Sequence, residues 1–517
     1  MKLEFEVYKD KVMGCWAGKN IGGILGAPFE ALRQWNEVEY YVQDLSKGPP
    51  PNDDLDLQII WLAAVEKFGR QVDASILGEY WLSYVIPNWV EYGTGKANMI
   101  QGLRPPVSGN FLNQYKDSCG CFIRSEIWAC LAPGRPEIAV LYAYEDGIVD
   151  HSGEGIYGEV FFAAMESAAF VESDVRKLID IGLSYIPADS AVAGCINKAV
   201  ECYDNKVEPK EARIKIHNEA PGTFGLNRKK ITEEQTEGGR MEVGTPGFDC
   251  PENVGFTIMG LLYGEGDFGK SIVIANACGE DTDCTAATLG AIMGIILGAS
   301  RLPEKWTAPV ENKIVTLCID KTSGFKVPET VTELTDRVLR ATPLFLGAEI
   351  CDLFAEGGYT IDCLEDLYCQ EDNYMPNHAY SPYPRGLSPR ELVNLSPNVV
   401  RYTFPTHWVM LDYGDNIYFR SEENRKIKIT IINNNIMCQQ MWCSIRIYTP
   451  ENVYTIGGSE FSLQLNTLNG QKGETVFEID ISDFTDGKLE LLFDISFAGR
   501  HTSTQAKAIL LRTGQYC

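Results

Sequence analysis

The chain lacks several features that mark large classes of proteins. No window reaches the ~18 uninterrupted apolar residues of a membrane-spanning helix. The opening MKLEFEVYKDKVMG has no basic stretch followed by an apolar core, so no signal peptide is visible. Basic residues are also outnumbered: the chain has 45 Lys and Arg against 71 Asp and Glu, which gives a net charge of −26. This excess of negative charge argues against a broad face that binds duplex nucleic acid, and leaves room only for a local basic pocket. We therefore expect a cytoplasmic protein that binds neither membranes nor nucleic acid.

The 16 cysteines include no CxxC pair. The spacing of Cys119-Gly120-Cys121 is too tight for a zinc knuckle. A chain this long without a secretion signal is expected to keep its thiols reduced. The cysteines therefore predict neither a disulfide scaffold nor a structural zinc site.

The 517 residues are enough for two or three domains, and the first part of the chain has a helical pattern. Apolar residues recur at helical spacing over 57–65, and helices are also predicted over 154–172 and 285–299. The last of these is rich in Gly and Ala, which allow close helix packing, so we expect it to be central and buried. The pattern predicts an all-α helical bundle over residues 1–345.

The pattern changes after an irregular connector at about 346–395. Apolar and polar residues then alternate over 427–431, 477–481 and 489–495, with turn residues between the runs. This period of two predicts a small antiparallel β-sandwich over 396–517. Its role is open: it could close an active site, mediate assembly or bind a saccharide.

Two acidic clusters precede predicted helices, at 52–56 and at 281–284. One interpretation is that they are helix N-caps. A cap needs only one side-chain oxygen, however, and each cluster supplies at least two carboxylates. If the clusters converge, repulsion would raise the pKa values of the carboxylates unless a cation is present. Oxygen ligands of this kind favour Mg²⁺ or Ca²⁺.

Three segments together resemble the ADP-ribosylglycohydrolase family. The run from Gly14 to Glu30, GCWAGKNIGGILGAPFE, is similar to the family's opening helix. Asn52-Asp53-Asp54 matches its first metal motif, normally Thr-Asp-Asp, and residues 279–284, GEDTDC, match its second, normally Gly-Gly-Asp-Thr-Asp-Thr or -Ser. The order, spacing and flanking helices agree over about residues 10–345.

The resemblance implies an all-α bundle with two Mg²⁺ ions, or alternatively Ca²⁺ or Mn²⁺, that hydrolyses a bond at the anomeric carbon of an ADP-ribosyl group on a small molecule or a protein. The implied metal ligands are Asp53, Asp54, Asp281 and Asp283, with Asn52 and Cys284 in the remaining ligand positions. Glu30 matches a glutamate proposed to act near the metals and the attacking water. Such residues suit the chemistry, because carboxylates stabilise the positive charge of the transition state and a dinuclear site lowers the pKa of bound water.

Two further matches concern the substrate. The segment 118–124, which includes Gly120, lies where the family has a glycine-rich, phosphate-facing loop, but most of the glycines are missing. His151 lies where the family often has a histidine near the ligand, and its alternative role is a structural hydrogen bond. At Cys284 a soft thiol replaces a hydroxyl, which is a poor match to Mg²⁺.

Two alternatives stay open. One is a hydrolase of another N- or O-riboside or glycoside that lacks a diphosphate, which the altered loop favours. The other is a non-catalytic, crystallin-like member of the family. The retention of four aspartates and Glu30 argues against the second alternative, because no structural role requires four converging acids. The oligomeric state is not predicted.

Overall fold

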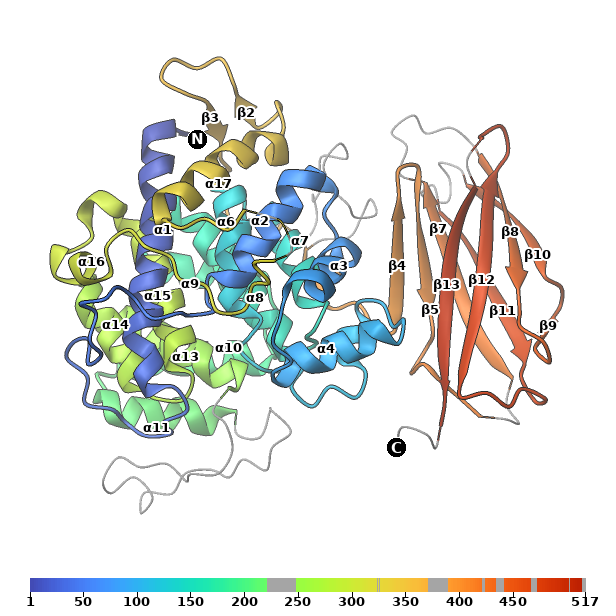
Figure 1. The fold of residues 1–517 in the computed structure, drawn as a ribbon. Helices are drawn as coiled ribbons and strands as arrows, with labels where there is room; N and C mark the ends of the chain where they lie inside the picture. Colours follow the sequence, from blue (N-terminus) through green and yellow to red (C-terminus); the bar gives the residue numbers. More distant parts are fainter. Residues whose placement is uncertain are drawn as a thin grey trace. The chain divides into compact units, whose positions relative to one another are not determined.

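The computed structural model describes residues 1–220, 248–322, 324, 326–370, 389–420, 424–433, 441–465, 472–501 and 503–513 (Figure 1). These residues form two compact units. The first contains Met1–Ala97, the described residues from Gly109 to 370, and those up to Asn394. The second contains Asn98–Ser108 and the described residues from Leu395 onward. The domain limits predicted at 345 and 396 stay predictions, although the grouping of Asn98–Ser108 with the second unit has no counterpart in the sequence pattern.

The N-terminal part of the chain is largely helical, as predicted. Its α-helices, in chain order, are α1 (Phe5–Gly26), α2 (Asp56–Phe68), α3 (Ala74–Tyr84), α4 (Val90–Ile100), α5 (Val107–Asn110), α6 (Ser125–Leu131), α7 (Pro136–Gly147), α8 (Glu154–Ala169), α9 (Val175–Ser184), α10 (Ala191–Asp204), α11 (Pro209–Glu219), α13 (Cys250–Tyr263), α14 (Phe268–Ala277), α15 (Thr282–Leu297), α16 (Glu304–Val310), α17 (Val331–Leu346) and α18 (Pro389–Val393). Short 3₁₀ turns are η1 (Ala27–Phe29), η2 (Gly69–Gln71), η3 (Phe122–Arg124) and η4 (Ala299–Arg301). No helix of the described residues has the length and hydropathy needed to cross a membrane.

Helices α1 and α15 pack against each other at the centre of the first unit (Figure 1). A Cβ atom on Gly18 would overlap the carbonyl oxygen of Gly290, and one on Gly14 would overlap that of Gly294. These small residues let the two backbones approach closely, and α15 is buried over Thr282–Ile295. The prediction of a central, buried helix at 285–299 is therefore confirmed.

Part of the predicted connector belongs to the first unit. Strands β2 (Cys351–Asp352) and β3 (Thr360–Asp362) form a three-stranded sheet with β1 (Lys2–Leu3), in the order β1-β3-β2. The sheet brings the N-terminal residues beside the segment that follows the last long helix. Residues 371–388 of the connector lie outside the described residues.

The second unit is rich in strands: β4 (Val399–Phe404), β5 (His407–Asp412), β6 (Tyr418–Phe419), β7 (Arg425–Asn433), β8 (Met441–Tyr448), β9 (Tyr454–Ile456), β10 (Glu460–Leu465), β11 (Lys472–Asp480), β12 (Lys488–Phe497) and β13 (Ser503–Arg512). They form two five-stranded sheets, ordered β10-β8-β12-β13-β6 and β4-β5-β7-β11-β9. All pairings are antiparallel except that of β13 with β6. The three alternating runs noted in the sequence form β7, β11 and β12.

Aromatic side chains from the two sheets meet inside the second unit. Phe477 of β11 lies between Phe461 of β10 and Phe493 of β12, with ring centroids 4.6 and 5.4 Å apart. His407 of β5 contacts Phe497 of β12 at 4.6 Å. One face of each sheet therefore carries a shared apolar core.

Candidate active site

The end of α1 lies between the two acidic motifs. Asp54 Oδ2 is 2.6 Å from the position of a Cβ atom on Gly23. A Cβ atom on Gly26 would overlap the backbone of Asp283, and the Thr282 hydroxyl donates a hydrogen bond to the Gly26 carbonyl oxygen, 2.9 Å away. The small residues of α1 thus bring together two acidic segments that are far apart in the sequence.

The carboxylates of the two motifs do not act as helix caps. The N-cap position of α2 is Leu55, and Asp281 at the N-cap of α15 makes no side-chain capping bond. By contrast, Asp267 caps α14 by accepting a hydrogen bond from the Lys270 amide at 2.7 Å. Capping therefore does not explain the acidic motifs.

The two motifs converge. The Asn52 side-chain amide donates to Asp283 Oδ2 at 3.5 Å, and Asn52 Oδ1 accepts from the Asp54 amide at 2.7 Å. Glu30, Asp281 and Asp283 each contribute an oxygen that lies within 4.8 Å of the others. Four acidic or amide side chains from three segments of the chain are thus held in one place.

Burial without compensation perturbs these carboxyl groups. Asp54 is 3% exposed, and neither of its side-chain oxygens has a hydrogen-bond partner among the described residues. Burial raises the pKa of Asp54 to about 8 and that of Asp53 to about 6. Burial and then the neighbouring Asp54 hold the pKa of Asp283 well above its ordinary value. Unpaired buried carboxylates are costly, so this donor set suits a divalent cation.

One buried lysine lies near the acidic cluster. Lys19 Nζ donates to Glu126 Oε1 at 2.7 Å, and both side chains are fully buried. Although burial opposes it, the charges of Glu126 and Asp54 raise the pKa of Lys19. Gln58 joins this network by donating to Glu126 Oε2 at 2.9 Å and to the Asp54 carbonyl at 3.2 Å. Because Lys19 is already paired with Glu126, it offsets little of the negative charge of the acidic cluster.

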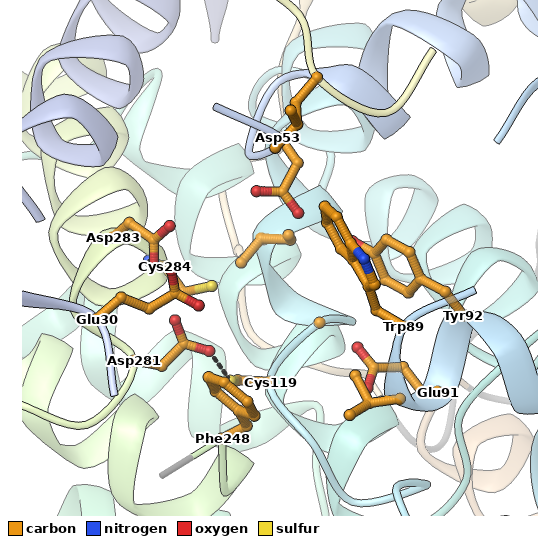
Figure 2. Close-up of a pocket in the computed structure, with 14 residues that line it drawn as sticks. Glu30, Asp53, Trp89, Glu91, Tyr92, Cys119, Phe248, Asp281, Asp283 and Cys284 are labelled. Carbon is orange, nitrogen blue, oxygen red and sulfur yellow. Dashed lines mark hydrogen bonds between the residues drawn. The ribbon is translucent and has the colours of Figure 1, made fainter. Parts of the chain in front are cut away.

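The acidic cluster faces a cavity of about 370 Å³ (Figure 2). The size is typical of sites for small molecules. The described residues that line it are Glu30, Asp53, Trp89, Val90, Glu91, Tyr92, Cys119, Gly120, Ile123, Phe248, Asp281, Asp283, Cys284 and Leu317. In Figure 2 the side chains of Glu30, Asp281 and Asp283 lie on one side and those of Trp89, Glu91 and Tyr92 on the other.

Glu30 directly follows η1, and its side chain is partly exposed to solvent at the cavity. Burial, followed by the charges of Asp281 and Asp53, raises the pKa of Glu30 to about 7. A carboxyl group with this pKa can exchange a proton near neutral pH. Its position beside the acidic cluster is the one that the sequence resemblance implied.

A buried ion pair fixes the segment that carries Glu30. Arg33 Nε donates to Glu280 Oε2 at 2.7 Å, and Arg213 lies 3.5 Å from the other oxygen of Glu280. The Ala31 amide donates to the Glu280 carbonyl at 2.8 Å. Glu280 has a φ of 66°, a left-handed conformation at the place where the family normally has glycine. The ion pairs and backbone bonds therefore hold Glu30 against the second acidic motif.

Two thiols lie beside the carboxylates. Cys119 Sγ donates to Asp281 Oδ2 at 2.6 Å, and the donor atoms of Cys119, Asp281 and Cys284 lie within 4.8 Å of one another. Sulfur ligands prefer softer cations than Mg²⁺. The sequence drew attention to Cys284, and the fold adds Cys119.

The two predicted substrate residues differ in their placement. Gly120 lines the cavity, where a Cβ atom would overlap Glu91 Oε1. His151 is fully buried and is not among the residues that line the cavity. Its Nε2 is 2.9 Å from Ser118 Oγ, and its Nδ1 is 2.9 Å from Asp150 Oδ1. His151 therefore supports the loop from behind, which agrees with its alternative role.

Several lining residues were not predicted from the sequence. Trp89, Glu91 and Tyr92 lie at the start of α4, and Phe248 precedes α13. No spacing pattern or charge run marks these residues. Cys119 and Ile123, by contrast, lie in the segment 118–124 that the sequence singled out.

A helical unit that gathers several carboxylates around one cavity has the side chains that glycoside hydrolysis requires. Residues 5–344 match the family model of ADP-ribosylglycohydrolase, and the chain belongs to this family. It is therefore a hydrolase of the glycosidase type. A search of curated proteins finds no match. Among solved structures, one described as an ADP-ribosylglycohydrolase-related protein complex is 16% identical, with a TM-score of 0.40, and the match covers 66% of this chain and 99% of that one.

Proposed function

We propose that this protein is a metal-dependent glycohydrolase that cleaves the bond at the anomeric carbon of an ADP-ribosyl or related ribosyl group. The main support is the pair of buried Asp54 oxygens, which have no hydrogen-bond partner among the described residues, within a cluster of carboxylates that faces a cavity. Such a cluster is destabilising without a cation, so its retention supports a role in binding one.

Asp53, Asp54, Asp281 and Asp283 would hold two divalent cations, Mg²⁺ in the first place, with Asn52 and Cys284 beside them. When bound, such ions would supply Lewis-acid activation of water and of ribose hydroxyls.

The residues of the chain supply the other parts of the reaction. Glu30 would accept the proton of the attacking water, since its pKa lies near neutrality. The surrounding carboxylates would stabilise the positive charge that develops on the sugar as the bond to the leaving group breaks. Arg33 and Glu280 would act by positioning Glu30. The substrate would be a small-molecule or protein-linked conjugate.

We also propose that residues 396–517 form a β-sandwich accessory domain. The aromatic contacts between the two sheets support this arrangement, because side chains from facing sheets interdigitate in a sandwich core. Trp408 and Tyr413 are both buried, so they are part of the core of this unit.

The decisive experiment compares Asp283→Asn with the wild-type protein. Both are assayed for bound metal and for turnover of ADP-ribosyl-arginine, ADP-ribosyl-serine, O-acetyl-ADP-ribose and simple ribosides. We expect Asp283→Asn to lose metal and turnover while remaining folded, since Asn keeps the shape of the side chain.

Asp267→Asn is the matched control, because Asp267 is a true helix cap and Asn caps about as well as Asp. It should change neither metal content nor turnover. If Asp283→Asn also left both unchanged, the proposed site would be wrong.

A further inference from the structure

The wall of the cavity opposite the acidic cluster carries a second, separate carboxylate. Glu91 is only 4% exposed, yet it lines the cavity (Figure 2). One of its oxygens, Oε1, lies against Gly120, where any side chain would displace it. The other, Oε2, has no hydrogen-bond partner among the described residues. A buried carboxylate oxygen without a partner is costly, so its retention calls for an explanation.

Structural contacts account for only part of the Glu91 side chain, because Oε2 has no hydrogen-bond partner among the described residues. The nearby buried cation, Arg124, is paired with Asp146 at 3.0 Å and with Asp150 at 2.8 Å. His151 is held by Ser118 and Asp150. Burial raises the pKa of Glu91 to about 7, although the neighbouring His151 and a hydrogen bond with Ser118 act against this shift. Among the described residues, Glu91 is thus not half of a salt bridge.

Aromatic rings lie beside Glu91. The rings of Trp89 and Tyr92 are 6.2 Å apart and close to parallel, at 26°. Trp89 is 47% exposed, and Phe248 lines the same cavity. Aromatic faces next to a carboxylate are a typical site for a flat, positively charged group.

The charge of the cavity points in the same direction. Five of its described lining residues are acidic, and none of those described is Lys, Arg or His. Cations at the metal motifs would offset the charges on that side only. Glu91 lies on the opposite wall, with its Oε1 against Gly120 of the loop at 118–124. A diphosphate beside Glu91 would be repelled.

We propose that Glu91, Trp89 and Tyr92 form the subsite for the leaving group of the substrate, and that this leaving group is a cationic, planar aromatic ring on a ribosyl unit without a diphosphate. The inference rests on the proposed function, since it assigns the substrate class of the same cavity. In the reaction, water adds to the anomeric carbon while the carbon–nitrogen bond of the N-riboside breaks. The bonding electron pair passes to the ring nitrogen and neutralises its charge. The water proton passes to Glu30 and then to solvent.

The test uses three probes: nicotinamide riboside, which is cationic without phosphate; inosine, which is neutral without phosphate; and NAD⁺, which carries the same cationic ring with a diphosphate. We expect wild-type kcat/KM to be highest for nicotinamide riboside. Glu91→Gln should raise KM for nicotinamide riboside by ~10-fold or more, the size expected for loss of a charge-assisted contact. For inosine the change in KM should stay below ~2-fold. The preference for nicotinamide riboside over NAD⁺, measured as the ratio of their kcat/KM values, should become smaller in Glu91→Gln.

Glu304→Gln is the matched control. Like Glu91, Glu304 lies in the first turn of a helix, so both changes remove the same favourable interaction with the helix dipole. Glu304 is exposed and is not among the residues that line the cavity. Glu304→Gln should therefore leave all three probes unchanged. If Glu91→Gln fails to fold, Trp89→Ala takes its place and should also raise KM selectively for nicotinamide riboside.

Two results would overturn the inference: a preference of the wild-type protein for NAD⁺, or an equal effect of Glu91→Gln on all three probes. If no probe and no ADP-ribosyl conjugate is hydrolysed, the proposed function fails. In that case the inference is tested separately, by measuring the Kd of nicotinamide riboside for the wild-type and Glu91→Gln proteins by calorimetry. Binding that weakens ~10-fold or more in Glu91→Gln supports it, and absent or equal binding overturns it.

Discussion

Removing the charge of Asp54 should stabilise the metal-free protein. The pKa of Asp54 is about 8 in the folded chain, against an ordinary value of 3.8, with burial as the main cause. Each pKa unit corresponds to ~1.4 kcal/mol, so ionised Asp54 costs the metal-free fold at most ~6 kcal/mol. Asp53, Asp54 and Asp283 titrate jointly, so we expect about a third of this from one substitution. Asp54→Asn should therefore raise the free energy of unfolding by ~2 kcal/mol near pH 8.

The pH dependence has a definite sign. The folded pKa lies above the unfolded one, so between about pH 4 and pH 8 the folded state binds more protons than the unfolded state. The stability of the metal-free protein should accordingly fall as pH rises through this range. Asp54→Asn should flatten the slope. Added Mg²⁺ should stabilise the wild-type protein at pH 8 by binding only the folded state, and the variant should lose most of this gain.

The assay is the thermal midpoint of chelator-treated protein, measured with and without Mg²⁺ across the pH range. For a helical unit of this size, an increase of ~2 kcal/mol corresponds to roughly 2–3 °C. Asp267→Asn, at a helix cap, should show neither the stabilisation nor the flatter slope. If Asp54→Asn lowered the midpoint of the metal-free protein at pH 8, the carboxylates would not form the uncompensated cluster described above.

Three further predictions concern neighbouring residues. Cys284→Thr should move metal preference from Zn²⁺ or Mn²⁺ toward Mg²⁺, measured as metal content after dialysis against an equimolar mixture; an unchanged content would exclude the thiol as a ligand. Arg33→Ala should cost ~3 kcal/mol of stability, because it removes one ion pair of the buried Glu280, and it should reduce kcat with little change in KM. Lys210→Ala removes an exposed ion pair and should change neither stability nor kcat. Turnover should rise as pH passes through the Glu30 pKa, about 7 in the metal-free site and lower with bound cations; Glu30→Gln should remove this dependence, and a pH profile that survives the change would exclude Glu30 as the base.

Local patterns were enough to predict the type of the elements that carry a clear periodicity. The apolar stripe at 57–65 and the small-residue run at 285–299 became α2 and α15, and the alternating runs became β7, β11 and β12. Such periodicities reflect which face of an element is buried, so they are visible without any tertiary information. The grouping of Asn98–Ser108 with the strand-rich unit was not visible, because it depends on contacts between distant segments.

The unusual residues can be identified from the sequence alone: two runs of carboxylates before helices, a glycine-rich helix and Glu30 after it. That these residues meet follows from the tertiary structure, in which Gly23 and Gly26 pack closely against both runs. The tertiary structure also places His151 behind the loop and Glu91 at the cavity. A lone glutamate at a helix start has no signature in sequence, because its chemistry depends on its burial and on the groups around it, and these are set by the packing of distant segments.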